Sequence, residues 1–204
     1  MIKEDVIYFG KRLYNQGLSP ATSGNISCIS DDNNILITAS GSAAGDLTFD
    51  DVVKINFQGE ILEGNKKASS EKTMHIKIYE KRPDIKAIIH SHSPEITAFA
   101  VSGSEINEVI MPEFAFYFGS IPISKYYLPS TVELAEDVAD LFKNKNAVLM
   151  KNHGIVVGGC DLKEAFYSLE SIQAYCKTYL CAKLLGKVKA LNKKQIKEID
   201  NLKH

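Results

Sequence analysis

Three histidines stand where their spacing would let them bind a single ion. His90 and His92 close the apolar stretch "IIHSH" at residues 88–92, and His153 lies much later, in "KNHG". Side chains two apart in a strand point to the same face, and a rise of about 3.3 Å per residue puts the two Cα atoms about 6.6 Å apart. Imidazoles at that spacing can converge on one metal through bonds of about 2.0–2.1 Å. The alternative is that they are unrelated polar residues of an ordinary fold.

His153 strengthens the metal hypothesis because it lies between two apolar runs. The chain must turn sharply at "NHG", and Gly154 would permit a positive φ there. Three histidines leave a fourth coordination position open, which is the pattern of a catalytic zinc, although nitrogen ligands also suit iron, cobalt, nickel or manganese. The other two histidines have no such context. We expect His75 to be a packing or surface residue of a helix and His204, the last residue, to be disordered.

Three short polar loops are candidates for binding a phosphate. Ser69, Ser70 and Glu71 form "SSE" at the expected start of a helix, where hydroxyls and free backbone N–H groups favour an anion. "TSGNIS" (22–27) and "TASGS" (38–42) each adjoin an expected strand, and their small residues let the backbone approach a ligand closely. Each loop by itself is more often a helix cap or a turn. Together they support the hypothesis of a phosphate cradle.

The sequence predicts one mixed α/β domain over residues 1–204, and the helices and strands of this domain must position the residues named above. The 204 residues, 45% of them hydrophobic, suffice for one core, and no linker, repeat or low-complexity block divides them. Strand-like runs alternate with helical ones, so we expect a mixed sheet that includes antiparallel hairpins and is layered with helices. The expected elements are a helix ending near Gly17, hairpins over 24–38 and 52–62, a helix ended by Pro83, strands at 86–92 and 119–124, a helix over 130–144, two strands within 147–159, and a helix over 161–185.

Composition argues against several other functions. The 24 basic and 25 acidic side chains give a net charge of −1, which does not suit a nucleic-acid partner. Charges throughout the N-terminal segment exclude a membrane span there. No two of the four cysteines form a C-x-x-C pair, so a thiolate zinc site is not indicated. We expect a cytoplasmic protein with reduced thiols and with neither a nucleic-acid nor a membrane partner.

Five motifs occur in order along nearly the whole chain: "SGN", "TASG", "SSE", "RPD" followed by "IIHSH", and "KNHG". This ordered set resembles the class II aldolase/adducin family. The resemblance implies a three-layer α/β/α sandwich around a mostly antiparallel central sheet, and a homotetramer with active sites between subunits. It implies that His90, His92 and His153 hold Zn²⁺ or another divalent transition metal. Glu71 matches a glutamate that ligates the free metal and then swings away to act as acid or base. Substrate-phosphate binding is implied for Gly24, Asn25, Ser40, Gly41, Ser69 and Ser70.

The implied reaction is the reversible cleavage of a ketose 1-phosphate, such as L-fuculose 1-phosphate, to dihydroxyacetone phosphate and an aldehyde. Glu71 favours carbon–carbon cleavage over epimerisation, because the family's ribulose-phosphate 4-epimerases usually carry Asp there. The three histidines make a non-catalytic scaffold like the adducin branch a weaker alternative. Aldolases of methylthioribulose or deoxyribulose 1-phosphate, and a methylthioribulose-1-phosphate dehydratase, are further alternatives on the same scaffold.

One position departs from the fuculose-phosphate branch of the family. Met111 stands where that branch has a tyrosine proton donor, and Pro112 and Glu113 follow it. Glu113 is therefore a candidate catalytic residue that replaces the tyrosine, and the alternative is a side chain that faces solvent. The aromatic run "FAFYFG" that follows is expected to serve core or interface packing, with a hydrophobic aldehyde pocket as its alternative.

Overall fold

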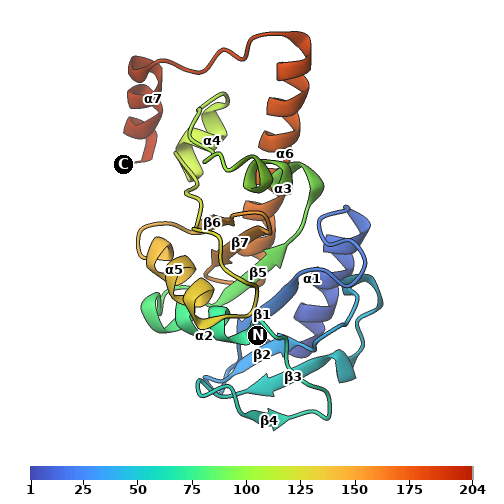
Figure 1. Cartoon of the computed structure of the whole chain (residues 1–204). Coiled ribbons are helices and arrows are strands. Elements are labelled where there is room, and N and C mark those ends of the chain that lie inside the picture. Colours follow the sequence, from blue (N-terminus) through green and yellow to red (C-terminus); the bar gives the residue numbers. More distant parts are fainter. Residues whose placement is uncertain (204) are drawn as a thin grey trace.

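A seven-stranded antiparallel sheet forms the centre of the computed structural model, which describes residues 1–203 (Figure 1). The strands lie in the order β4-β3-β2-β1-β5-β7-β6, and every neighbouring pair is antiparallel. Their bounds are β1 Asn25–Ile29, β2 Ile35–Thr38, β3 Val52–Ile55, β4 Ile61–Glu63, β5 Ala87–Ser91, β6 Ala147–Met150 and β7 Gly154–Gly159. Strand β5 contains His90 and ends one residue before His92. It is hydrogen-bonded on both sides, to β1 and to β7.

Helices cover both faces of this sheet, which confirms the expected three-layer α/β/α sandwich. On one face lie α1 (Lys3–Asn15), α3 (Pro94–Ser102) and α6 (Leu162–Leu185), and on the other lie α2 (Lys72–Lys81) and α5 (Val132–Phe142). Each face has its own hydrophobic core. The sheet thus separates two cores, and its strands contribute to both.

Strand β5 shows how the sequence directs side chains into the two cores. Ile89 packs into the core beneath α1, α3 and α6, whereas Ile88 packs into the core beneath α2 and α5. Because successive side chains of a strand alternate between faces, His90 shares the face of Ile88. The first candidate ligand therefore points toward the layer that contains α2.

Several helix starts follow from their first residues. The Thr131 side chain accepts a hydrogen bond from the backbone N–H of Leu134 at the start of α5, at 3.4 Å. Asp161 caps α6 by accepting from the backbone N–H of Glu164 at 2.7 Å. Pro94 opens α3, where the missing N–H would have had no helical partner. These residues fix where each helix begins.

Two local predictions are wrong. Residues 119–124 were expected to form a strand, but Ile121 and Ile123 take part only in isolated bridges, to Ile106 and Leu149. Pro122 between them has no N–H to donate to a ladder, which limits pairing on this segment. The positive φ expected at Gly154 occurs instead at Asn152, with a φ of 58°.

Two short helices that are distant in the sequence lie side by side at one end of the molecule (Figure 1). These are α4 (Pro112–Tyr117) and α7 (Lys193–Asp200), and α7 follows α6 through an extended run. Phe114 of α4 is buried and stacks on Tyr175 of α6 at 4.2 Å, in agreement with the packing role expected for the aromatic run. His204, for which disorder was expected, lies outside the described residues. Among residues 1–203, no helix combines the length and apolar character needed to cross a bilayer.

Candidate metal centre

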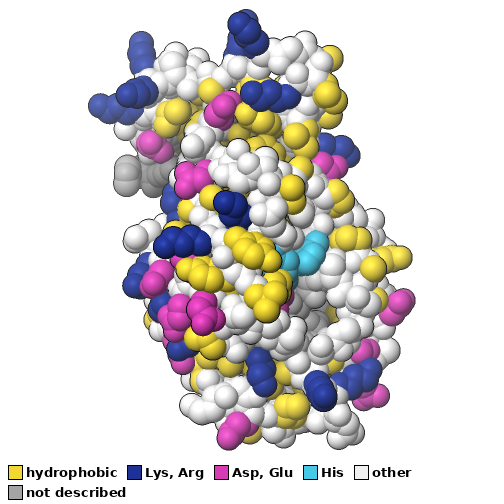
Figure 2. All heavy atoms as spheres, viewed as in Figure 1, with side chains coloured by type: hydrophobic (Ala, Val, Ile, Leu, Met, Phe, Trp, Pro, Cys, Tyr) yellow, Lys and Arg dark blue, Asp and Glu magenta, His cyan; other side chains and the backbone are white. Residues whose placement is uncertain are grey.

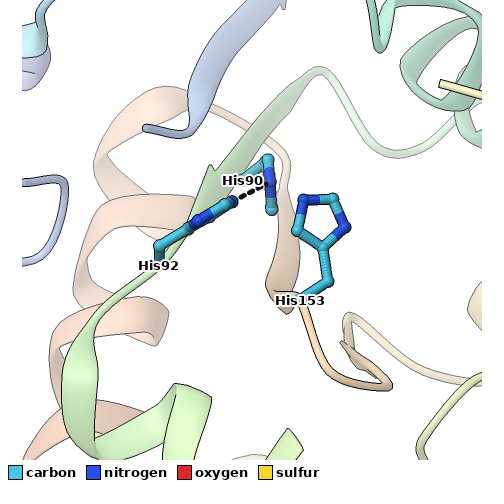
Figure 3. A group of neighbouring side chains, drawn as sticks. All are labelled: His90, His92 and His153. Carbon is cyan, nitrogen blue, oxygen red and sulfur yellow. Dashed lines mark hydrogen bonds between the residues drawn. The ribbon is translucent and has the colours of Figure 1, made fainter. Parts of the chain in front are cut away.

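Three histidine side chains meet at one end of β5 and β7 (Figure 3). His90 is in β5, His92 is the first residue after it, and His153 lies in the turn between β6 and β7. The ring centroids are 4.6 Å apart for His90 and His92, and 4.8 Å for each of these with His153. One nitrogen from each ring lies within 4.8 Å of the others. The proximity that the spacing predicted for His90 and His92 is therefore present, and His153 joins them.

A backbone carbonyl fixes the orientation of the His90 ring. The Nδ1–H of His90 donates to the carbonyl oxygen of Ile155 at 2.9 Å, so its Nε2 keeps a free lone pair. That Nε2 lies 2.8 Å from Nε2 of His92. A Cβ at Gly154 would collide with the carbonyl oxygen of Ser91 and would lie 3.2–3.3 Å from the rings of His92 and His90. Gly154 is thus required for close approach rather than for its φ angle.

Glu71 brings a carboxylate to the same place. It is buried and immediately precedes α2. The helix was expected to start within "SSE" (69–71), and it begins at Lys72. Its Oε2 lies 3.2 Å from Nε2 of His90, and its Oε1 lies 3.7 Å from Nε2 of His153. Oε1 is buried and has no hydrogen-bond partner within the described part of the chain. A buried carboxylate oxygen without a donor, facing imidazole nitrogens, fits a cation at this position.

The local electrostatics keep the ligand atoms in the form that binds metals. Burial lowers the pKa of His92 to about 3 and that of His153 to about 4, so both rings are neutral at pH 7. Burial opposes ionisation of Glu71, but His90, His153 and the amide of Asn25 outweigh it and hold the Glu71 pKa below its usual value. Neutral imidazoles and an ionised carboxylate are the donors that a divalent transition metal takes.

The centre is accessible from outside. His92 and His153 are half-buried, whereas His90 is fully buried. Figure 2 shows histidine side chains reaching the surface near the middle of one face, next to a group of hydrophobic side chains. A small molecule can therefore approach from this side.

The loops expected to bind phosphate lie together beside the centre. Ser40 donates its backbone N–H to the carbonyl of Lys67 at 2.9 Å, and Ser69 donates its own to Thr38 at 3.1 Å, so the loops after β2 and before α2 are joined. Gly24 and Asn25 line a small cavity shared with Thr38. Gly24 adopts a φ of +77°, and a Cβ there would collide with the carbonyl of His90. The remaining predicted residues, Gly41 and Ser70, are exposed on the same two loops.

Glu113 stands apart from this cluster. It lies exposed in the first turn of α4, a helix that packs against α6 and α7. Within residues 1–203 no hydrogen bond or ion pair joins Glu113 to the histidines or to Glu71. Its catalytic role stays a prediction.

One polar residue of the site was not singled out from the sequence. His75 is completely buried, and its Nε2 lies 2.5 Å from Oδ1 of Asn25, whose Nδ2 donates to Glu71 at 2.8 Å. The signal available in the sequence is its position four residues after Glu71, which places both on one helical face. The expected packing role is correct, but it omits this contact.

The fold and this centre define a member of the class II aldolase/adducin family. Residues 4–180 match the model of the class II aldolase and adducin N-terminal domain, and the chain belongs to that family. It is 31% identical over 204 residues to 3-oxo-tetronate 4-phosphate decarboxylase of Haemophilus influenzae, covering 98% of this chain and 96% of that protein. It is 32% identical over 198 residues to 5-deoxy-D-ribulose 1-phosphate aldolase of Bacillus thuringiensis serovar kurstaki, covering 97% and 92%.

A solved structure extends the likeness to three dimensions. An L-fuculose 1-phosphate aldolase superposes with a TM-score of 0.90 and 30% sequence identity, covering 98% of this chain and 95% of that one. Family members are lyases, named as aldolases or decarboxylases, and they act on sugar phosphates. Class II aldolases depend on a metal, and the cluster of His90, His92 and His153 is able to bind one.

Proposed function

We propose that this protein is a zinc-dependent lyase that reversibly cleaves a ketose 1-phosphate, such as L-fuculose 1-phosphate, to dihydroxyacetone phosphate and an aldehyde. One observation carries the proposal: the carboxylate of Glu71 lies 3.2 Å from His90 and 3.7 Å from His153, in a cluster whose nitrogens converge. An acid/base group beside a metal-binding triad is what carbon–carbon cleavage next to a carbonyl requires.

The proposed roles rest on the family resemblance, and the positions of the clustered residues support them. His90, His92 and His153, with Glu71, hold the metal. When bound, Zn²⁺ or another divalent transition metal supplies Lewis-acid stabilisation of the negative charge that develops on the substrate oxygens. Gly24, Asn25, Ser40, Gly41, Ser69 and Ser70 bind the substrate phosphate, which holds the sugar with its carbonyl toward the histidines.

The proposed reaction requires one proton to be removed and one to be added, and two carboxylates are candidates for these transfers. A base removes the proton of the C4 hydroxyl, the C3–C4 bond breaks, and the aldehyde leaves with the new C=O bond. The bonding electron pair stays on the three-carbon fragment. Glu71, after taking a proton from solvent, would deliver it to C3 to complete dihydroxyacetone phosphate, while the base releases the C4 proton to solvent. Glu113 is the candidate for the C4 proton, because Met111 occupies the position of the tyrosine found in the fuculose-phosphate branch.

A second candidate function is decarboxylation of a 3-oxo-tetronate 4-phosphate. The likeness to the Haemophilus influenzae protein favours it, with 31% identity over nearly the full length of both chains. Loss of CO₂ from that acid leaves the same electron pair on the same three-carbon phosphate, so Glu71 would protonate an identical fragment. Since CO₂ leaves without loss of a hydroxyl proton, this reaction needs no residue in the role proposed for Glu113.

Product analysis decides between these functions. Purified, zinc-loaded protein is incubated separately with L-fuculose 1-phosphate, 5-deoxyribulose 1-phosphate, methylthioribulose 1-phosphate and 3-oxo-tetronate 4-phosphate. Dihydroxyacetone phosphate with an equal amount of aldehyde supports the aldolase, and dihydroxyacetone phosphate with CO₂ supports the decarboxylase. A dehydrated product that retains all its carbons indicates the dehydratase instead. No dihydroxyacetone phosphate from any of the four overturns both proposals.

We further propose a homotetramer with active sites at its subunit interfaces and a cytoplasmic location. Support for the assembly comes from the family resemblance and from exposed apolar side chains near the end of α6, where Leu184 and Leu185 are 89% and 91% exposed. Their exposure in a single chain is what a self-association surface requires.

A further inference from the structure

A chain of buried hydrogen bonds begins one helical turn after Glu71. His75, fully buried in α2, has Ser27 Oγ 2.6 Å from its Nδ1 and Asn25 Oδ1 2.5 Å from its Nε2. The hydroxyl of Tyr79 lies 2.7 Å from Ser27 Oγ. At the other end, Nδ2 of Asn25 donates to Oε2 of Glu71 at 2.8 Å. Four side chains from β1 and α2 thus lead from the interior to the proposed acid/base residue.

The carboxylate at the end of this chain determines the direction of every bond. An ionised carboxylate only accepts, so the Asn25 group that faces Glu71 is its NH₂ and the group that faces His75 is its C=O. His75 Nε2 must then carry the proton, because a carbonyl oxygen only accepts. Its Nδ1 is consequently the acceptor from the Ser27 hydroxyl, and Ser27 Oγ accepts from Tyr79. This arrangement holds for a neutral ring, because an imidazolium would instead donate from Nδ1 to Ser27 Oγ and reverse the bond to Tyr79.

A neutral ring is required for this arrangement, and the surroundings supply one. A charged imidazolium in a site with no exposed surface is costly unless a carboxylate contacts it directly. Within residues 1–203, the groups in hydrogen-bond contact with the ring are an amide oxygen and a hydroxyl. His75 is therefore the Nε2–H tautomer.

We propose that His75 is a positioning residue for the reaction: by donating Nε2–H to Asn25 Oδ1, it fixes the amide so that its NH₂ faces Glu71. Loss of this donor leaves Asn25 free to rotate and to present its oxygen to the carboxylate, which would repel it. Glu71 would then lose the hydrogen bond that holds it against His90. The kinetic part of this inference rests on the proposed function, whereas the tautomer does not.

Two substitutions at position 75 separate positioning from structural support. His75→Leu removes the donor and should lower kcat by about 10- to 100-fold with little change in KM and with the metal retained. His75→Gln offers an amide N–H₂ close to the position of Nε2 and should recover most of the lost kcat. Ile78→Val, a cavity-forming change in the same buried helix face, is the matched control and should leave kcat unchanged. An unaltered kcat in folded His75→Leu overturns the inference, as does equal loss in His75→Leu and His75→Gln.

A double-mutant cycle tests whether His75 acts through Asn25. Asn25→Ala removes the amide, so adding His75→Leu to it should cause no further fall in kcat. If the two effects on kcat multiply, His75 acts by another route and the inference is wrong. The comparison uses kcat because Asn25 is also a proposed phosphate-binding residue, and its loss is expected to raise KM.

The tautomer is measured without any substrate. Long-range ¹H–¹⁵N correlation spectra of the ¹⁵N-labelled wild-type protein should show His75 protonated at Nε2 and bare at Nδ1. The side-chain amide protons of Asn25 should exchange slowly in the wild type and in His75→Gln, and rapidly in His75→Leu. Protonation at Nδ1 overturns the inference whatever reaction is catalysed. If the spectra agree while no substrate is cleaved, the proposed function fails and the hydrogen-bond assignment stands.

Discussion

At Glu71, the imidazoles of His90 and His153 and the amide of Asn25 act on a single buried carboxylate. The Asn25 amide donates to Oε2, and Oε1 has no hydrogen-bond partner within residues 1–203. One oxygen is therefore oriented by the protein, while the other is available to a cation or to a substrate proton. This division suits a residue that both ligates a metal and transfers a proton.

Removing the charge of Glu71 should separate these two tasks. Glu71→Gln preserves the shape of the side chain but cannot take up or return a proton. We expect the fold and the three-histidine metal site to persist and kcat to fall by about 10²- to 10⁴-fold. Steady-state kinetics together with metal analysis checks this, and turnover at the wild-type rate would assign the proton transfer elsewhere.

His92 should be indispensable for the metal. His92→Ala removes one of three converging nitrogens, so we expect the bound zinc per chain to fall toward zero after dialysis, as measured by elemental analysis. Cys160→Ser is the control, because Cys160 is an exposed thiol outside the cluster that is able to bind zinc adventitiously. Equal zinc content in His92→Ala and in the wild type would contradict the proposed site.

Acidification should destabilise the protein through its buried histidine. Burial lowers the pKa of His75 from 6.5 to about 3, so between these values the unfolded chain binds a proton that the folded chain does not. The free energy of unfolding therefore rises with pH across this window and falls on acidification, by up to about 1.4 kcal/mol per pH unit for one histidine. Urea unfolding at about pH 6 and about pH 5 should show a smaller loss for His75→Leu than for the wild type. Identical losses would mean that His75 is protonated in the folded state.

The residue types and spacing predicted much of this site. The strand period brings His90 and His92 together, and the turn at "KNHG" adds His153, so the triad followed from local rules. His75 did not follow, because its spacing of four residues from Glu71 is common in helices and by itself does not distinguish packing from a polar network. The role of Gly154 was also misassigned, since a close approach to the Ser91 carbonyl depends on pairing between distant strands.

At the scale of elements, the site depends on how closely β5 and β7 approach. His90 pairs with Val156 and Ser91 with Ile155 in this ladder, and Gly154 follows at its end. Both histidine-bearing segments leave the sheet here, so the position of one strand end fixes that of the other. A rigid ladder of this kind is a suitable base for a preorganised metal site.

Adding one methyl group at the strand end should disturb stability and metal binding together. In Gly154→Ala the new Cβ collides with the Ser91 carbonyl, so we expect a loss of about 1–3 kcal/mol in the free energy of unfolding and weaker zinc binding. Val157→Ala, in the same strand but directed into the opposite core, should reduce stability while leaving zinc affinity unchanged. Chemical denaturation and zinc titration measure both effects; full zinc affinity in Gly154→Ala would show that the strand ends adjust independently.

Elements with a strong period were predicted best. The hairpins of β1 with β2 and β3 with β4 followed from short strand-like runs separated by polar turns, and the long helix α6 was expected over 161–185. Residues 119–124 looked equally apolar and β-branched. They form no strand because pairing depends on a neighbour, and Pro122 limits what a neighbour can bond.

At the scale of the molecule, the proposed tetramer makes the single chain an incomplete unit. Leu184 and Leu185 are nearly fully exposed at the end of α6. We expect sedimentation velocity to give a species of four chains, and Leu185→Glu to shift it toward smaller species through the cost of burying a charge in an interface. Lys183→Glu, two residues earlier on the same helix end, is the control for added negative charge outside the apolar pair. A wild-type monomer at micromolar concentration would contradict the assembly.

Some segments of the chain are bonded to the central sheet more extensively than others, and this difference affects which segments can change in sequence without loss of the fold. Strands β5 and β7, at whose ends the triad lies, are held on both sides. In the described structure, the segment 104–129 instead bridges to the sheet at Ile123, which pairs with Leu149, while Ile106 and Ile121 pair with each other within the segment. Insertions or exchanges in that segment therefore disturb few sheet bonds. A laboratory library confined to it, with Glu113, β5 and β7 untouched, would vary the leaving group that is accepted while inheriting an intact reaction centre.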